Sequence, residues 1–208
     1  MRERSVLFWD FDGVIKDSVE IKADAYEHLF SAFGSELAAR VRDHHERNCG
    51  VSRFEKIPLY LAWAGRVTLR DEAERYCKLF SATVRQAVID SPWVAGAREY
   101  LEANYLRQRF VLLTATPQAE IEDIIEAVEI AHCFQEVHGA PTPKADAIIS
   151  VLTRWQCLRN NALVIGDSQS DYEAAVAAGV GFLLRKTPLN RSLQLAYSGP
   201  QCQDFSNG

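Results

Sequence analysis

The sequence has no long apolar run, no paired cysteines and no excess of positive charge. Although 48% of the 208 residues are hydrophobic, no stretch approaches the ~18 consecutive apolar residues that a membrane-spanning helix needs. The first residues, Met-Arg-Glu-Arg-Ser, lead directly into a predicted strand and leave no room for a signal peptide. We therefore expect a cytoplasmic protein with no membrane partner.

The cysteine pattern argues against a disulfide-bonded protein, and the charge balance argues against a nucleic-acid-binding protein. The five cysteines are odd in number and form no Cys-x-x-Cys pair, so we expect reduced thiols. The 28 acidic and 23 basic residues give a net charge of −5 at pH 7, which argues against nucleic acid as the main partner. A chain of this length forms one domain, or one domain with an insertion.

Four unbroken apolar segments are typical of strands buried on both faces of a parallel sheet. They are residues 6–11, 110–114, 162–166 and 181–184, and the shorter segment 136–138 is a fifth candidate. Helical periodicity separates the later strands, with Thr116 and Thr142 as the expected N-caps. This alternation predicts an α/β fold with a doubly wound parallel sheet.

Residues 16–87 break this alternation, because helical periodicity dominates there and no strand is convincing. We expect four helices, beginning after Asp17 or Ser18 and then near residues 37–45, 53–64 and 69–88. The predicted organisation is a core of residues 1–15 and 88–208 and a helical cap of residues 16–87. Such an insertion lies over the carboxyl ends of the strands, where open α/β sheets bind ligands. The tail beyond Leu189 is expected to be loosely ordered.

Asp10 and Asp12 follow the first predicted strand with one residue between them. Alternate residues of a strand point the same way, so both carboxylates enter one small volume. Two like charges that close are unfavourable unless a cation lies between them or one keeps its proton, and Mg²⁺ prefers carboxylate oxygens. Taken alone, this Asp-x-Asp-Gly sequence, which ends at Gly13, is equally consistent with a turn.

The other predicted strands also end in polar residues. One ends in Thr114 and Ala115, another ends in Asp167 with Asp171 four residues later, and Lys144 precedes a helix. Carboxylates, a hydroxyl group and an ammonium group around one crevice suit phosphoryl transfer. Taken singly, Thr114 could be an ordinary residue before a helix, Lys144 a solvated lysine and Asp171 a helix-start residue.

Together these motifs resemble the haloacid dehalogenase superfamily, in the subgroup with a helical cap that includes phosphoglycolate phosphatase and β-phosphoglucomutase. The motifs occur in order as Asp10-Phe11-Asp12-Gly13-Val14, Thr114, Lys144 and Gly166-Asp167-Ser168-Gln169-Ser170-Asp171. The resemblance implies a Rossmann-like core and a phosphatase that uses Mg²⁺. Its expected substrate is a small phosphorylated metabolite, such as a sugar phosphate or a phosphoglycolate-like compound.

The resemblance also implies catalytic and metal-binding roles. Asp10 would attack phosphorus and become an aspartyl phosphate. Asp12 would donate a proton to the leaving alkoxide and then take one from the water that hydrolyses the intermediate. Asp10, the backbone carbonyl of Asp12, and Asp167 would hold Mg²⁺, with Asp171 in support.

Five residues are expected to contact the substrate. By resemblance, Thr114 and the following backbone N–H groups, beginning at Ala115, would hold the phosphoryl oxygens, and Lys144 would offset the charge of nucleophile and phosphate. Arg53 lies in Gly50-Val51-Ser52-Arg53, which resembles a cap loop whose arginine meets a distal anion; the alternative is an exposed surface arginine. Lys22 could attract an anionic substrate or be only a solvated helix residue.

Three functions remain open within this resemblance. In β-phosphoglucomutase-like mutases, a histidine early in the first cap helix confines acid–base activity to the closed state. Lys22 stands at that position and cannot act as such a switch near neutral pH, which favours a phosphatase over a phosphosugar mutase. A non-catalytic phosphate-binding regulatory module would be expected to lose Asp10 or Asp12, and both are present. The cap implies a small substrate, and we expect a monomer or a weak dimer.

Overall fold

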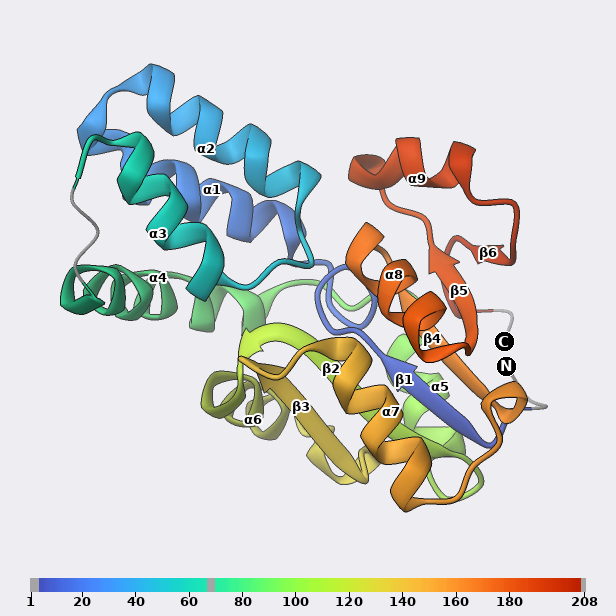
Figure 1. The fold of residues 1–208 in the computed structure, drawn as a ribbon. Coiled ribbons are helices and arrows are strands. Elements are labelled where there is room, and N and C mark those ends of the chain that lie inside the picture. Colours follow the sequence, from blue (N-terminus) through green and yellow to red (C-terminus); the bar gives the residue numbers. More distant parts are fainter. Residues whose placement is uncertain (1–3, 67–69, 207–208) are drawn as a thin grey trace.

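The computed structural model describes residues 4–66 and 70–206 and contains a six-stranded sheet with helices on both faces (Figure 1). The strand order is β3-β2-β1-β4-β5-β6, and all neighbouring strands run parallel. The strands are β1 (Val6–Trp9), β2 (Arg109–Pro117), β3 (Glu136–Ala140), β4 (Ala162–Gly166), β5 (Gly181–Arg185) and β6 (Gln201–Cys202). The predicted doubly wound α/β fold is confirmed.

In the described part of the chain, five α-helices lie between β1 and β2, and the first four of them gather beyond the carboxyl ends of the strands (Figure 1). These four are α1 (Val19–Phe30), α2 (Ser35–Arg47), α3 (Arg53–Trp63) and α4 (Arg70–Asp90). The predicted boundary at residue 87 falls inside α4, and residue 69, the predicted start of that helix, lies outside the described residues.

The remaining helices alternate with the strands from β2 onward. Those that the sequence predicts are α6 (Gln118–Ala127), α7 (Lys144–Arg154) and α8 (Gln169–Ala178). The structure adds α5 (Ala97–Asn104) and α9 (Arg191–Ala196), which the sequence analysis did not predict. Among the helices of residues 4–66 and 70–206, none is both long enough and apolar enough to cross a bilayer.

Alternate residues of β1 supply the apolar cores on the two faces of the sheet. Leu7 and Trp9 pack with α5 and α6, whereas Val6 and Phe8 pack with α7 and α8. All four side chains are at most 1% exposed, which explains why this strand reads as an unbroken apolar run. The strand is thereby fixed between two helical layers, and its carboxyl end meets the cap.

The chain passes between the core and helices α1–α4 twice, and the two connecting segments pair with each other. Lys16 forms an antiparallel bridge with Trp93, and the Asp17 N–H donates to the Pro92 carbonyl at 2.8 Å. The buried Lys16 ammonium donates to the Ile89 carbonyl at 3.0 Å and lies 4.6 Å from the centre of the Trp93 ring. The cap is therefore attached through one short two-stranded linker.

Two predicted N-caps are wrong. β2 continues through Pro117, so α6 begins one residue later and Thr116 belongs to the strand. Pro117 pairs with Ala140 of β3, and this pairing outweighs the local preference for a helix start. Similarly, the N-cap of α7 is Pro143 rather than Thr142.

Residues 190–206, the described part of the tail, contact the sheet, contrary to the prediction of a loosely ordered segment. β6 pairs with β5, and the Gln201 amide donates to the carbonyls of Gln194 and Tyr197 at 3.0 and 2.8 Å. The Tyr197 hydroxyl donates to the Phe182 carbonyl at 2.7 Å. These hydrogen bonds depend on the folded sheet, which local sequence does not reveal.

Candidate active site

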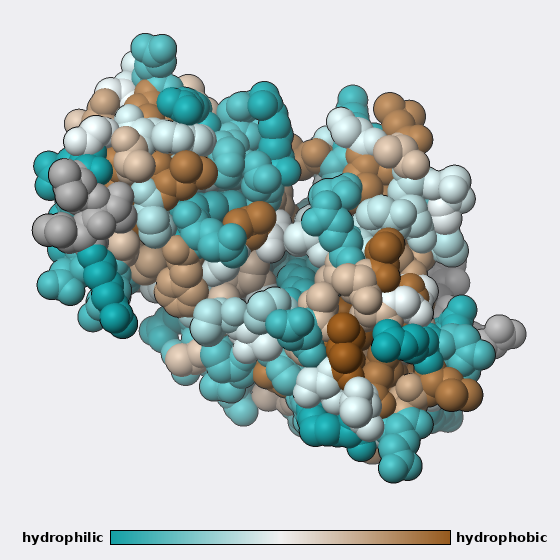
Figure 2. Space-filling model, in the orientation of Figure 1, coloured by the Kyte–Doolittle hydropathy of each residue, from teal (hydrophilic) through white to brown (hydrophobic). Residues whose placement is uncertain are grey.

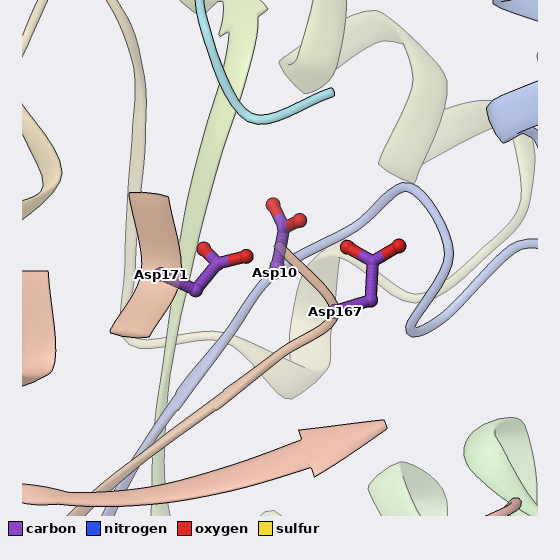
Figure 3. Close-up of side chains that lie close together, drawn as sticks. All are labelled: Asp10, Asp167 and Asp171. Carbon is purple, nitrogen blue, oxygen red and sulfur yellow. The ribbon is translucent and has the colours of Figure 1, made fainter. Parts of the chain in front are cut away.

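An acidic cluster lies where the neighbouring strands β1 and β4 end. The Asp10 N–H donates to the Ile165 carbonyl at 2.9 Å, which places Asp10 beside the end of β4. Asp10, Asp167 and Asp171 are buried, and each offers a carboxylate oxygen within 4.8 Å of the others (Figure 3). Asp10 lies between the other two, which come from the end of β4 and from α8 (Figure 3). Three acids from two motifs that are distant in sequence therefore converge.

Gly13 makes room for this cluster. Its φ is +75°, and a Cβ at this position would clash with the Oδ2 atom of Asp167. Its N–H donates to the Lys16 carbonyl at 2.7 Å, which closes a tight loop after the strand. Only glycine meets both demands. The Asp-x-Asp-Gly sequence is thus a turn and also part of the acidic cluster.

Lys144, the first residue of α7, bridges two of the three carboxylates. Its ammonium lies 2.9 Å from Oδ1 of Asp10 and 2.6 Å from Oδ1 of Asp171, and its side chain is 9% exposed. Oδ2 of Asp171 accepts from the Ser168 N–H at 3.1 Å and from its hydroxyl at 2.6 Å, in a capping box at the start of α8. Both oxygens of Asp171 are therefore engaged, and its support of a metal stays a prediction.

Burial and crowded negative charge raise the pKa values of two acids in the cluster. Burial raises the pKa of Asp10 to about 7, with Lys144 opposing and the Asp171 and Asp12 carboxylates adding to the rise. Burial, followed by the charges of Asp10 and Asp171, raises the pKa of Asp167 well above its ordinary value. Three carboxylates therefore face one nearby ammonium, a charge surplus that favours protonation.

The donor set fits a hard divalent cation. The Asp167 side chain makes no hydrogen bond with the described residues, so its oxygens are available as ligands. A cation of charge +2 would offset the surplus and take carboxylate oxygens. The binding of this cation by Asp10 and Asp167 stays a prediction.

Asp12 lies in a different environment, although only one residue separates it from Asp10. Its carboxylate accepts hydrogen bonds from the Ser18 hydroxyl at 2.6 Å, from the Lys22 ammonium, and from the Thr116 hydroxyl at 3.3 Å. Burial alone would raise the pKa of Asp12, but Lys22 and Ser18 outweigh it and hold this pKa below its ordinary value. Asp12 is therefore ionised near neutral pH.

Lys22 is buried in α1, so the interpretation as a solvated helix residue is wrong. It is 9% exposed, and its ammonium donates to Asp12 and, at 2.9 Å, to the Thr116 hydroxyl. Helix α1 begins after Ser18, as predicted, and Lys22 follows one turn later on the face toward the core. Its contact with a substrate stays a prediction.

The end of β2 brings three residues to the same edge of the sheet. Thr114 is 2% exposed, and its hydroxyl oxygen accepts from the Thr116 N–H at 3.1 Å, which leaves the hydroxyl hydrogen available to donate. Ala115 and Thr116 line a cavity of about 30 Å³ together with Asp12 and Lys22. The sequence analysis missed the Thr116 hydroxyl, because Thr116 was taken as a helix cap.

Arg53, the first residue of α3, is 3% exposed, so the surface interpretation is wrong. Its guanidinium makes two hydrogen bonds of 2.7 Å to the Glu120 carboxylate of α6 and also donates to the Ser81 hydroxyl. It lies 4.6 Å from the centre of the Phe80 ring. This bidentate ion pair joins α3 to α6. Contact between Arg53 and a distal anion stays a prediction for a state in which the pair opens.

Removing one partner of this pair should be costly. We expect Glu120→Gln to lower the free energy of unfolding by about 3–5 kcal/mol, because it leaves a buried guanidinium without its carboxylate. The double variant Arg53→Met/Glu120→Leu should lose less, and urea denaturation would measure both. Arg85→Gln is the matched control: Arg85 of α4 pairs at 2.9 Å with Asp123 of α6, but both side chains are more than half exposed. Its loss should cost at most about 1 kcal/mol, and an equal cost for both single variants would contradict the role of Arg53.

The loop before α3 packs directly on the core. A Cβ at Gly50 would clash with the hydroxyls of Ser170 and Ser168, so the cap loop touches the start of α8. A cleft of about 440 Å³ remains beside this contact, lined by Asp167 and by residues at the ends of α2, α8 and α9. In Figure 2 the cap side of the notch between α2 and α9 is largely hydrophilic. The cleft therefore opens beside Asp167 of the acidic cluster.

Comparisons with known proteins extend over most of the chain. A phosphorylated carbohydrates phosphatase of Thermotoga maritima is 25% identical over 189 residues, which cover 84% of this chain and 81% of the relative. A phosphoglycolate phosphatase of Pseudomonas savastanoi pv. phaseolicola is 24% identical over 204 residues, which cover 94% and 74%. A solved structure described as a predicted phosphoglycolate phosphatase from Haemophilus somnus shares the fold, with a TM-score of 0.77 at 18% identity over 99% and 96% of the two chains.

The family comparison covers the whole arrangement of motifs. The model of haloacid dehalogenase-like hydrolases matches residues 6–184, a span that includes Asp10, Thr114, Lys144, Asp167 and Asp171. The same span contains the four helices inserted after β1 and the strands that converge on the acidic cluster. The chain therefore belongs to the haloacid dehalogenase-like hydrolase family.

Proposed function

We propose that the protein is a Mg²⁺-dependent phosphatase that hydrolyses a small phosphorylated metabolite through an aspartyl-phosphate intermediate. The observation that carries this proposal is the position of the two aspartates. Asp10 lies in the acidic cluster, 2.9 Å from the Lys144 ammonium, whereas Asp12 is not a member of that cluster. A carboxylate that shares a cation with other acids suits the nucleophile, and a second carboxylate outside the cluster suits proton transfer. Relatives named for phosphoglycolate and for phosphorylated carbohydrates support a substrate of this kind.

In the first step, a carboxylate oxygen of Asp10 attacks phosphorus, and the bond from phosphorus to the leaving oxygen breaks. Lys144, 2.9 Å from Asp10, offsets the charge, and Thr114 with the Ala115 N–H holds the phosphoryl oxygens. Asp12 gives its proton to the leaving alkoxide. Because Lys22 keeps Asp12 ionised in this structure, the substrate must first draw the ammonium away so that Asp12 can take up that proton.

In the second step, water attacks the aspartyl phosphate, Asp12 accepts a proton from that water, and inorganic phosphate leaves with Asp10 restored. Mg²⁺ at Asp10, Asp167 and the backbone carbonyl of Asp12 would supply positive charge for the phosphoryl group. Helices α1–α4, which we take as a cap of residues 16–87, cover the reacting atoms and restrict the substrate to a small molecule.

A phosphosugar mutase is the second candidate, and the contact of Lys22 argues against it. A mutase must protect its aspartyl phosphate from water until a second sugar hydroxyl arrives. The Lys22 ammonium that donates to Asp12 instead favours an ionised Asp12 carboxylate, which can accept a proton from water. A phosphate-binding regulatory module would not need two aspartates in such different environments.

The decisive experiment measures inorganic phosphate released from a panel of phosphorylated metabolites with Mg²⁺ and with EDTA. We expect release with Mg²⁺ and none with EDTA. Full activity in the chelator would contradict the metal-dependent mechanism. Hexose 1-phosphates with a trace of the bisphosphate test the mutase: isomerisation faster than phosphate release would show that the phosphatase assignment is wrong.

Mg²⁺ should also stabilise the protein, and more at pH 8 than at pH 5. A carboxyl whose pKa is higher in the folded than in the unfolded state stabilises the fold fully below the unfolded value, and this contribution is lost as pH rises through the folded value. For Asp10 that window runs from 3.8 to about 7. Mg²⁺ binds the ionised form, so thermal unfolding with and without Mg²⁺ should show the larger rise in Tm above this window.

Asp167→Asn tests the same site by thermal unfolding, without reference to activity. The variant removes one acid from the cluster, so the rise in Tm with Mg²⁺ should disappear. Asp146→Asn, an exposed acid on α7, is the matched control and should keep the full rise. A rise that is equal at pH 5 and pH 8, or that persists in Asp167→Asn, would contradict the proposed metal site.

A further inference from the structure

The cavity of about 30 Å³ beside Asp12 is closed on its far side by the cap. Lys22 and Thr116 line it near Asp12, and His45 and Tyr26 line it from the cap helices. This cavity is where the leaving group would lie, because Asp12 is the proposed proton donor to the leaving oxygen. Its size leaves room for only a few heavy atoms.

His45 of α2 carries an unused polar atom into this cavity. The residue is 3% exposed, and its ring lies 4.7 Å from that of Tyr26. Its Nδ1 atom lies 3.0 Å from the Lys56 ammonium, whereas its buried Nε2 atom has no hydrogen-bond partner among the described residues. Buried polar groups are almost always paired, so the unpaired nitrogen points to a ligand that completes the site.

The contact with Lys56 decides which hydrogen His45 presents. In its charged form the Lys56 ammonium has only hydrogens to donate, so Nδ1 is then the acceptor and the ring proton is on Nε2. Burial and the nearby Lys56 ammonium hold the pKa of His45 well below its ordinary value, so the ring is neutral. Nε2–H is therefore a donor, polarised by the ammonium behind it, and it suits an oxygen acceptor.

One of the three cations near the cavity forms no ion pair with a carboxylate of the described residues. Lys22 pairs with Asp12, and Arg53 pairs with Glu120. Lys56 is 1% exposed, and no carboxylate of the described residues forms an ion pair with it. Burial lowers the pKa of Lys56 to about 7, and an anion held by His45 would favour the charged ammonium.

We propose that His45 and Lys56 form a subsite for a carboxylate on the leaving group, so that the substrate is a short phosphorylated hydroxy acid rather than a neutral alcohol or a sugar phosphate. The carboxylate accepts a hydrogen bond from the Nε2–H group of His45. The Lys56 ammonium, on the Nδ1 side of the imidazole ring, offsets the negative charge of the carboxylate. This inference rests on the proposed phosphatase function and selects among its substrates.

The test compares two substrates that differ only in the carboxylate, 2-phosphoglycolate and 2-hydroxyethyl phosphate. We expect the wild-type protein to prefer the acid by about 10- to 100-fold in kcat/KM, the size of one hydrogen bond to a charged group. Lys56→Met and His45→Phe should each lower this ratio at least about tenfold. The exposed residues in Lys78→Met and His28→Gln are matched controls that should keep it.

Product inhibition gives a second readout that does not depend on turnover of the acid. Glycolate should inhibit hydrolysis of p-nitrophenyl phosphate more strongly than ethylene glycol does, and Lys56→Met should remove the difference. Wild-type protein that hydrolyses both phosphates equally, or prefers a sugar bisphosphate, would overturn the subsite and leave the phosphatase intact. A wild-type protein that releases no phosphate from any substrate with Mg²⁺ would overturn the proposed function itself.

Discussion

Replacing Asp10 with asparagine should lower kcat by several orders of magnitude and leave the fold intact. Asparagine keeps the shape of the side chain but removes the attacking charge and one metal ligand. Lys144 retains its partner Asp171, 2.6 Å away, and the cluster loses one of three crowded negative charges. A phosphate-release assay with Mg²⁺ would measure the loss, and far-UV circular dichroism would check the fold.

Trapping the intermediate separates the loss of a nucleophile from the loss of a metal ligand. Wild-type protein quenched in acid during turnover of a radiolabelled phosphomonoester should carry label, and Asp10→Asn should carry none. Asp167→Asn, which removes a proposed metal ligand but not the nucleophile, should still acquire label slowly. Label on Asp10→Asn, or activity within about tenfold of wild type, would contradict the assignment of Asp10 as nucleophile.

The second large effect is expected at Asp12. Asp12→Asn leaves the nucleophile in place but deletes the proton donor, and general acid–base catalysis is typically worth ~10²–10⁴-fold. The loss should be smallest for p-nitrophenyl phosphate, whose leaving group needs no proton. The same loss for alkyl and aryl phosphates would show that Asp12 is not the leaving-group acid.

Lys22→Met should change the pH dependence that Asp12 imposes. Lys22 lowers the pKa of Asp12 against the effect of burial, so its removal raises this pKa and keeps the acid protonated to higher pH. The alkaline limb of the kcat/KM profile for an alkyl phosphate, which reflects the free enzyme, should therefore move upward. An unchanged limb would show that Lys22 does not control the protonation of Asp12 in the free enzyme. His28→Gln, an exposed change on the same helix, serves as the control.

The sequence predicted the acidic cluster because its residues follow buried strands. In a parallel sheet the carboxyl ends of the strands meet at one edge, so Asp10 and Asp167 converge once β1 and β4 are recognised as strands. The predicted cap helices also formed, since each has an apolar stripe that packs against its neighbours. Local sequence patterns were therefore sufficient to predict the helices and strands whose own residues determine which of their side chains are buried.

The missed features depend on partners distant in sequence. Glu120 is 67 residues from Arg53, and Lys22 is 94 residues from Thr116, so no local spacing relates either pair. His45 lies in α2 and its partner Lys56 in α3, 11 residues later, so their contact also depends on how two helices pack. Thr116 belongs to β2 because β2 pairs with β3 in this region. This pairing outweighs the local sequence preference for a helix start.

We expect the close contact of Gly50 with Ser168 and Ser170 to set an upper limit on substrate length. A Cβ at Gly50 would clash with both serine hydroxyls, so the loop before α3 lies directly against the start of α8. A phosphate ester too long for the space beneath helices α1–α4 would keep this contact from forming and would let bulk water reach Asp10. Discrimination against longer phosphate esters would then require no residue that touches their extra atoms.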